Sequence, residues 1–203
     1  RPLDFLVIAD HAVNLGVLPR LADGDHSVLQ TEIGRRWHKL LLAGHLNMQE
    51  ILTSASDKPF LEALKSVFGG GLGSFIWRSW YFKIEDKNQA EVIRDEVFRR
   101  SVWAEIIDDA ERYNKPGIFT AFSGYEWTPN TDGTVHRAVI FKDGAERVVQ
   151  VLPFSSYDSV NPEDLWNYFS AYEKNTGGSV LAIPHNSNLS NGVMFSLMDF
   201  QGK

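Results

Sequence analysis

The sequence predicts an α/β protein, and three observations indicate this class. Apolar and β-branched segments at residues 3–9, 118–125 and 179–183 are typical of short buried strands. The stretches between them repeat apolar residues at helical spacing. Residues 114–117 combine asparagine, proline and glycine, which ends a helix directly before the strand that contains Phe119. A helix that ends directly before a strand is typical of the alternating helices and strands of an α/β fold.

The composition excludes several classes of protein. The 203 residues carry a net charge of −6 and no cluster of Lys or Arg, which argues against a nucleic-acid partner. No apolar run approaches the ~20 residues that a membrane-spanning helix requires. The absence of cysteine excludes disulfides and thiolate ligands, so a metal site would depend on His, Asp and Glu.

The first residues lead directly into a predicted strand. Residues 3–9 form a near-continuous apolar run, the pattern of a strand covered on both faces. Asp10 and His11 follow at its carboxyl end, where α/β folds place their chemistry. The alternative is that Asp10 caps a helix and His11 fills a loop. No start methionine or signal peptide precedes the strand, so we expect a piece of a longer chain, with any export or other localisation signal outside it.

Residues 15–100 predict a helical insertion without strands. Helices are expected over residues 31–52, 59–67 and 89–113, and the glycine-rich segment 69–74 is interpreted as a linker because it lacks the ending of a phosphate-binding loop. His38 and His45 lie seven residues apart, but no third ligand joins them, so we expect neither to bind a metal. The insertion is expected to belong to a single domain spanning residues 1–203.

A hairpin is predicted after residue 118. Glu126 appears where the apolar run 118–125 ends, residues 129–133 form a turn, and a second strand over residues 134–141 opens with His136. If these strands pair, Glu126 and His136 lie roughly opposite one another. Such a pair can share a metal ion or a proton. The alternative is a solvent-exposed hairpin without a special role.

The remaining chain continues the α/β pattern. Residues 147–153 predict an extended segment, and a helix begins at Pro162 and ends at the glycine pair 177–178. The strand 179–183 follows and runs into Pro184, His185 and Asn186. A histidine thus again follows a strand end.

These strand ends together predict a metal site. Three of the six histidines, His11, His136 and His185, lie at or just beyond strand ends, as does Glu126. Imidazoles with a carboxylate suit a divalent ion such as zinc, manganese or iron. The alternative is four unrelated loop residues, which becomes a weaker explanation with each recurrence.

The same residues carry a resemblance to a known superfamily. Residues 5–11, the sequence Gly124-Tyr125-Glu126 followed ten residues later by His136, and residues 182–186 resemble motifs of the PHP (polymerase and histidinol phosphatase) superfamily. More closely, the chain resembles the DUF3604 family of PHP-like proteins, and this resemblance runs along most of it. The segments that carry the closer resemblance are residues 1–5, 124–128, 136–137, 151–156 and 184–190.

The resemblance implies a distorted (β/α)7 barrel, here incomplete at both ends and carrying a helical insertion. It also implies hydrolysis of a small-molecule phosphoester by a multinuclear metal site. Glu126 would bridge two metals, His136 and His185 would complete one site, and His11 would bind another metal. Asp10 would orient His11 or act beside it, which makes Asp10, His11 and Glu126 the catalytic candidates. Arg137 and Asn186 are the candidate substrate-binding residues.

The resemblance is incomplete in a way that sets further expectations. The opening His-x-His motif and the closing Asp-x-His motif of the superfamily are absent from this sequence. We therefore expect one site, formed by Glu126, His136 and His185, and negligible hydrolysis by this piece alone. Two alternatives stay open: hydrolysis of another ester or of an amide, and a degenerate barrel that binds ligands through aromatics such as Trp127 and Trp166.

Overall fold

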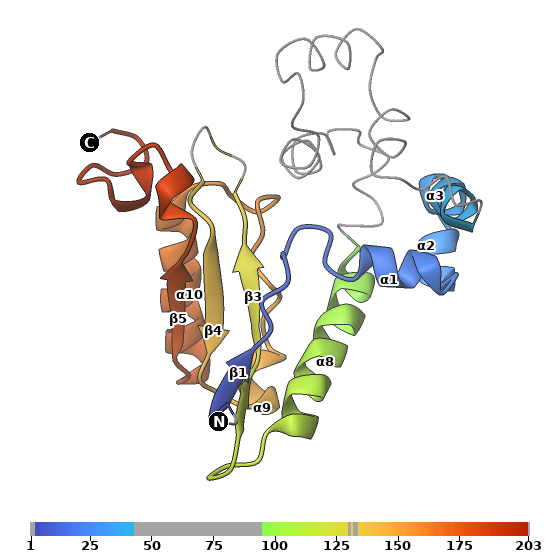
Figure 1. Cartoon of the computed structure of the whole chain (residues 1–203), viewed down its shortest axis with the longest axis horizontal. Coiled ribbons are helices and arrows are strands. Elements are labelled where there is room, and N and C mark those ends of the chain that lie inside the picture. Colours follow the sequence, from blue (N-terminus) through green and yellow to red (C-terminus); the bar gives the residue numbers. More distant parts are fainter. Residues whose placement is uncertain (1–2, 43–94, 130, 132–133, 203) are drawn as a thin grey trace, which may run out of the picture. The chain divides into compact units, whose positions relative to one another are not determined.

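The computed structural model describes residues 3–42, 95–129, 131 and 134–202 (Figure 1). The chain divides into two compact units, one made of Arg1–Leu15 with Arg99–Lys203 and the other of Gly16–Phe98. The helix predicted at 59–67, the linker at 69–74 and His45 lie outside the described residues. The predicted mixture of helices and strands is confirmed, and within the described residues the strands form two small sheets and no closed barrel.

The predicted hairpin is the centre of the first unit. Strand β3 (Gly124–Trp127) pairs antiparallel with β4 (Arg137–Phe141), and β4 pairs antiparallel with β5 (Val180–Pro184). The register sets Glu126 opposite Ala138 and Trp127 opposite Arg137. Because successive side chains of a strand point to opposite faces, Glu126 lies on one face of this sheet and Trp127 on the other.

The apolar run at 118–125 is two strands rather than one. Strand β2 (Thr120–Phe122) pairs in parallel with β1 (Phe5–Val7), whereas β3 pairs with β4. The change of partner falls at the buried Ser123, whose carbonyl oxygen accepts a hydrogen bond from the N–H of Phe141. The prediction of one continuous strand was therefore wrong, because an apolar run does not reveal where a chain changes its pairing partner.

The segment after β1 runs alongside β3. His11 forms an isolated parallel bridge with Glu126. The N–H of Glu126 donates to the carbonyl oxygen of Asp10 at 2.7 Å, and the N–H of Ala12 donates to the carbonyl oxygen of Glu126 at 2.8 Å. Residues 10–12 are thus fixed to the strand that carries Glu126.

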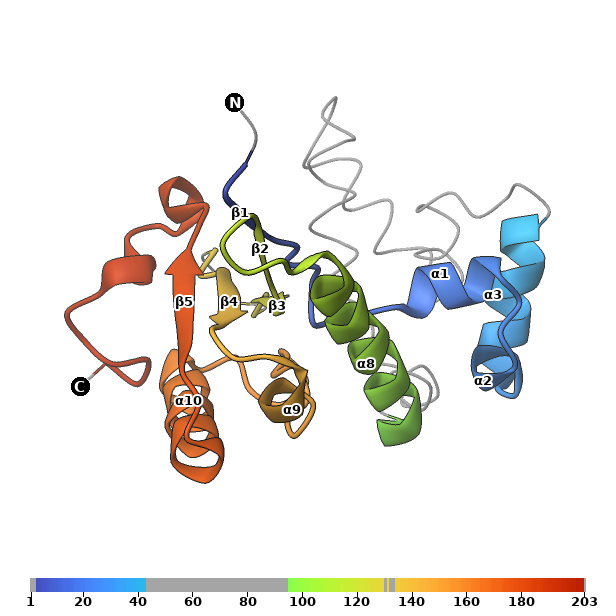
Figure 2. The same ribbon diagram turned by 90° about the horizontal axis from the view of Figure 1, so that it is seen from below.

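Helices cover one face of the three-stranded sheet. Figures 1 and 2 show α9 (Ala145–Val148) and α10 (Pro162–Thr176) on the same side of β4 and β5. Asn161 caps α10 by accepting a hydrogen bond from the N–H of Glu163, and Gly177 ends it at φ 66°, as the sequence predicts. The extended segment predicted at 147–153 was wrong, because Val148 belongs to α9 and is fully buried.

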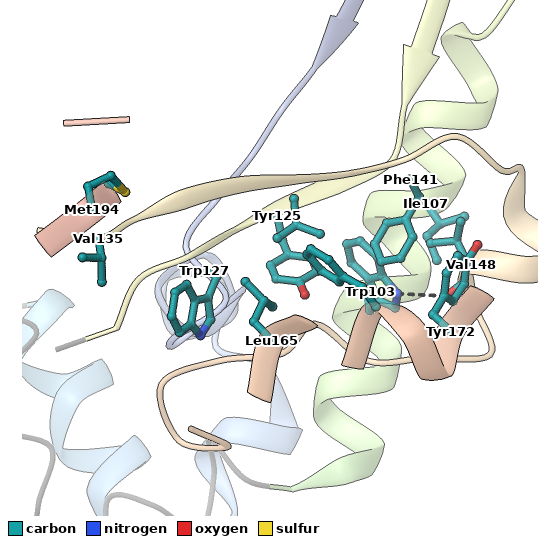
Figure 3. Packing of buried hydrophobic residues seen from close by; sticks show 12 residues of the cluster. Trp103, Ile107, Tyr125, Trp127, Val135, Phe141, Val148, Leu165, Tyr172 and Met194 are labelled. Atoms are coloured by element: carbon teal, nitrogen blue, oxygen red, sulfur yellow. Dashed lines mark hydrogen bonds between the residues drawn. The ribbon is translucent and has the colours of Figure 1, made fainter. Parts of the chain in front are cut away.

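The core lies between this sheet face and the helices. Figure 3 shows its aromatic rings, and the indole N–H of Trp103 donates to the carbonyl oxygen of Val148 at 3.3 Å. Trp103 lies on α8 (Glu96–Tyr113), which begins after Asp95, so the prediction of one helix over 89–113 was wrong at residue 95. The buried residues of this cluster are Trp103, Ile107, Tyr125, Trp127, Val135, Val139, Phe141, Val148, Leu165, Phe169, Tyr172 and Met194.

The predicted double-sided burial of the first strand was also wrong. Phe5 and Leu6 of β1 are 66% and 43% exposed. Strand β5 is buried on one face alone, since Leu181 and Ile183 are exposed while Val180 and Ala182 pack against the core. Within the described residues, the helices cover only the face that carries Tyr125 and Trp127, which leaves these apolar side chains uncovered.

Within its described residues 16–42, the second unit forms three short helices, α1 (Val17–Ala22), α2 (His26–Leu29) and α3 (Glu32–Leu42). Asp25 caps α2 by accepting a hydrogen bond from the N–H of Ser27 at 2.8 Å. His38 of α3 contacts the carbonyl oxygen of Leu21 through Nδ1. The described helices include none with both the length and the apolar character required to cross a membrane.

Candidate metal centre

Glu126 is the buried carboxylate around which the site is built. Its neighbours in β3, Tyr125 and Trp127, point into the core, so strand alternation directs Glu126 to the opposite face. Only 12% of its side chain is exposed. A buried charge at this position requires partners of opposite charge or hydrogen-bond donors.

Three imidazoles converge on one oxygen of this carboxylate. The Nδ1 atom of His136 and the Nε2 atom of His185 each lie 3.0 Å from Glu126 Oε1. The Nδ1 atom of His11 lies 3.4 Å from the same oxygen. We call His11, Glu126, His136 and His185 the Glu126 cluster. Its geometry confirms that the predicted strand-end residues meet at one place.

The backbone positions each histidine separately. His136 directly precedes β4 and His185 directly follows β5, so these two residues meet at one end of a strand pair. The N–H of His185 donates to the carbonyl oxygen of His136 at 3.1 Å. His11 reaches the cluster through its parallel bridge with Glu126. The imidazole rings of His136 and His185 have centroids 5.8 Å apart, and those of His11 and His136 have centroids 6.4 Å apart.

The cluster is electrostatically arranged to hold Glu126 as a carboxylate. Burial by itself raises the pKa of this group, but the close approach of the His11 and His136 imidazoles and the electrostatic influence of His11 and His185 outweigh it. The net effect lowers the pKa of Glu126 to about 2. The carboxylate is therefore ionised at neutral pH, the form in which it can bind a metal ion.

Glu126, His136 and His185 can hold a metal ion. One ligand atom from each of these residues lies within 4.8 Å of the other two, and no other such group occurs among the described residues. Ligand atoms 2.0–2.1 Å from a tetrahedral zinc ion are about 3.3 Å apart, and the carboxylate–imidazole distances are close to this value. The donor set therefore fits a divalent ion. We call these three residues the metal triad.

The other predicted site residues lie in different surroundings. His11 contacts Glu126 but does not belong to the metal triad. Asp10 is exposed, and its carbonyl oxygen accepts the hydrogen bond from Glu126. Asn186 is exposed, with a left-handed backbone at φ 58°. Arg137 is buried on the core face, with its guanidinium close to the indole rings of Trp127 and Trp166.

Sequence reasoning missed the backbone support from residues 10–12. The hydrogen bonds of Asp10 and Ala12 to Glu126 extend the β1 side of the sheet past the end of the apolar run. A polar Asp-His pair carries no strand signal, so hydrophobic periodicity could not have found this pairing. Strand alternation could have indicated that Arg137, directly after His136, points away from the cluster.

Comparison with known proteins gives one result. The family model described as Protein of unknown function (DUF3604) matches residues 1–203. No curated protein and no solved structure matches the chain.

Proposed function

Because the chain belongs to the DUF3604 family, whose description assigns no function, we propose a function from the geometry of the Glu126 cluster. The metal triad binds one divalent ion, which is zinc, manganese or iron, in the active site of a hydrolase. The observation that carries this proposal is the meeting of two imidazole nitrogens at 3.0 Å on a single buried carboxylate oxygen.

The donor set supports this class of ion. Imidazole nitrogen suits zinc, manganese and iron, and the absence of cysteine excludes a thiolate site. Three protein ligands leave a coordination position open, which is the arrangement of catalytic rather than structural zinc sites. When bound, an ion of this kind polarises a substrate oxygen and activates water for attack.

We assign the residues of the chain the following roles. Glu126, His136 and His185 hold the ion. His11 belongs to the hydrogen-bonded segment 10–12, and its Nδ1 atom lies 3.4 Å from Glu126 Oε1, where it can bind a second ion or hold a proton during the reaction. Asp10 supports Glu126 through its carbonyl oxygen. Asn186, exposed next to His185, is placed to contact a substrate.

The proposed substrate class is a phosphoester. The resemblance of residues 5–11, 124–136 and 182–186 to PHP motifs supports this choice, as it supports a PHP-type barrel for the complete fold. A site that combines metal ions with neutral or cationic imidazoles also suits a substrate with negatively charged oxygens. Hydrolysis of another ester or of an amide remains the alternative outcome of the test.

Metal binding tests the first part of the proposal. The purified protein is stripped with a chelator, offered zinc, manganese or iron(II), and assayed by calorimetry and by elemental analysis. We expect one tightly bound ion, and a loss of affinity of at least about tenfold in Glu126→Gln, His136→Ala and His185→Ala. His26→Ala is the matched control, because His26 is exposed and belongs to the other unit. Equal binding by all four variants would contradict the metal triad.

Substrate class is tested on the metal-loaded full-length protein. A panel of a phosphomonoester, a phosphodiester, a carboxylic ester and an anilide separates the bond types. We expect turnover of a phosphoester that is lost in Glu126→Gln. Exclusive turnover of the anilide or carboxylic ester would leave the metal site in place and overturn the phosphoester assignment.

A further inference from the structure

A cavity lies on the core face of the sheet, away from the Glu126 cluster. It has a volume of about 610 Å³ and is bounded by Arg137 of β4, the first turns of α10, and residues 193–200. Cavities of this size accommodate small organic ligands. Because Arg137 pairs with Trp127 and not with Glu126, strand alternation sets this cavity and the Glu126 cluster on opposite faces.

Arg137 supplies a buried positive charge at this cavity. Only 7% of the residue is exposed, and its guanidinium lies 5.7 Å from the ring centre of Trp127 and 5.2 Å from that of Trp166. One of its N–H groups donates to the carbonyl oxygen of Val135. Burial lowers the pKa of Arg137, which the negative charge of Glu163 partly opposes. No carboxylate among the described residues forms an ion pair with this guanidinium, so its remaining N–H donors are available to a ligand.

Glu163 supplies the complementary acceptor. Its backbone N–H is used by the cap of Asn161, while its Oε2 atom is buried without a hydrogen-bond partner among the described residues. A buried carboxylate oxygen without a partner costs roughly 1–3 kcal/mol, and more when it is charged. Glu163 and Arg137 both line the cavity and yet form no ion pair with each other in the described structure. Arg137 and Glu163 thus border one space without forming an ion pair, and Asp199 adds a second carboxylate to its wall.

The rest of the cavity wall is largely apolar. Trp166, Val193, Met194, Met198 and Phe200 line it together with Val135. Trp166 is 40% exposed, so part of its indole ring is accessible to a ligand. Methionine and aromatic side chains adapt well to a flat or flexible apolar group. An apolar wall with a few convergent polar groups is the usual composition of a small-molecule site.

We propose that this cavity binds a free α-amino acid with a large apolar or aromatic side chain. The ligand's carboxylate accepts hydrogen bonds from Arg137, its ammonium group donates to the carboxylate of Glu163, and its side chain packs against Trp166 and Met194. A simple anion would meet the carboxylate of Glu163, and a simple cation would meet the guanidinium of Arg137. Only a zwitterion satisfies both groups. This site is independent of the proposed metal site, because no residue is shared between them.

Calorimetry or ligand-detected NMR on the complete chain tests the proposal. The ligands are L-phenylalanine, L-leucine and L-tryptophan, with 3-phenylpropionate and phenethylamine as analogues that each lack one charged group. We expect saturable binding of at least one amino acid with a dissociation constant near or below about 1 mM. For a phenylalanine-binding site, both analogues should bind at least about tenfold more weakly, because each leaves one charged group of the protein unpaired.

Two variants distinguish a specific binding site from a cavity that binds no ligand specifically. Glu163→Gln keeps the size of the side chain. It should weaken the binding of the amino acid about tenfold without weakening the binding of 3-phenylpropionate. Glu146→Gln is the matched control, since Glu146 is exposed on α9 and does not line the cavity. Circular dichroism and thermal unfolding verify that both variants fold. Glu126→Gln should bind the amino acid as the wild-type protein does.

Three results would overturn the proposal. The first is the absence of binding by all three amino acids at about 10 mM, a concentration ten times the expected constant. The second is equal affinity of the wild-type protein and Glu163→Gln for the amino acid. The third is binding of 3-phenylpropionate as tightly as L-phenylalanine, which would identify a simple anion site at Arg137.

Discussion

His136 and His185 are joined through their backbones as well as through their shared carboxylate. The N–H of His185 donates to the carbonyl oxygen of His136 at 3.1 Å, and one ring nitrogen of each residue lies 3.0 Å from Glu126 Oε1. The spacing of the two imidazoles is thus set by sheet pairing between β4 and β5 rather than by loop conformation. Ligands fixed in this way lose little conformational freedom when an ion binds.

Replacing His11 should separate metal binding from catalysis. His11 lies outside the metal triad, so His11→Ala should change the affinity for the first ion by less than about threefold, while His136→Ala should reduce it by at least about tenfold. Hydrolysis by the full-length protein should fall strongly in both variants. Calorimetry and a steady-state assay check this pair of effects, and a loss of metal binding in His11→Ala equal to that in His136→Ala would make His11 a ligand of the same ion.

The carboxylate of Asp143 should make the stability of the fold depend on pH. It accepts hydrogen bonds from the N–H of Ser179 at 2.6 Å, the hydroxyl of Tyr172 at 2.9 Å and the guanidinium of Arg147 at 2.8 Å. Burial raises the pKa of Asp143, but these partners outweigh it and lower the pKa below its ordinary value of 3.8. Its contribution to stability is therefore fully present above the unfolded pKa and is lost as the pH falls through the lower folded pKa.

Asp143→Asn tests this dependence. We expect the variant to lose about 1–3 kcal/mol of unfolding free energy at pH 7. The difference from the wild-type protein should shrink below the ordinary aspartate pKa, because the wild-type carboxylate becomes protonated as well. Urea unfolding at pH 7 and near pH 3 measures both values. Asp108→Asn on α8 is the control, since Asp108 is exposed, and a deficit of Asp143→Asn that is unchanged at low pH would contradict the electrostatic origin.

Two leucines should report the one-sided burial of the sheet. Leu165 is fully buried in the core cluster, and Leu181 of β5 is 53% exposed. Leu165→Ala should cost about 2–5 kcal/mol of unfolding free energy, since it removes buried methyl groups and leaves a cavity. Leu181→Ala should cost less than about 1 kcal/mol. Chemical denaturation of both variants provides the comparison, and a cost at Leu181 equal to that at Leu165 would show that the exposed face is covered in solution.

Gly177 should be required for the end of α10. Its φ of 66° is a left-handed conformation, and an added Cβ atom would meet nothing within 4 Å. Gly177→Ala should therefore cost about 1 kcal/mol through backbone strain alone. Gly177→Asn should cost less, because asparagine tolerates this conformation better. Thermal unfolding can rank the three proteins, and equal stability of all three would exclude backbone strain as the reason for glycine.

The sequence predicted the parts of the site that depend on local signals. The predicted pairing of the strands on either side of residues 129–133 was sufficient to bring Glu126 and His136 together, and the strand end at Pro184 located His185. The change of partner strand at Ser123 could not be predicted, because both halves of the run are equally apolar. The burial of β1 and β5 could not be predicted for a similar reason. An apolar residue indicates a tendency to be buried but does not indicate which element covers it.

The Arg137 cavity shows a different limit. Arg137 was predicted as a substrate-binding residue at the metal site, and the structure sets its guanidinium over the ring of Trp166 instead, in a cavity that Glu163 also lines. Trp166 and Glu163 lie three residues apart on α10, so they share a helix face. Their meeting with a residue of β4 depends on how the helix packs on the sheet, which is long-range information.

Glu126 lies on β3, which pairs with residues 10–12 on one side and with β4 on the other. Metal binding therefore depends on the register of β3. A slip of one residue in β3 would exchange the two faces of the strand, bringing Tyr125 to the histidines and burying the carboxylate among Trp103 and Phe141. An ion that binds only the native register stabilises that register alone by mass action. The metal would therefore stabilise the native strand register selectively. Its addition during refolding would increase the fraction of chains with that register.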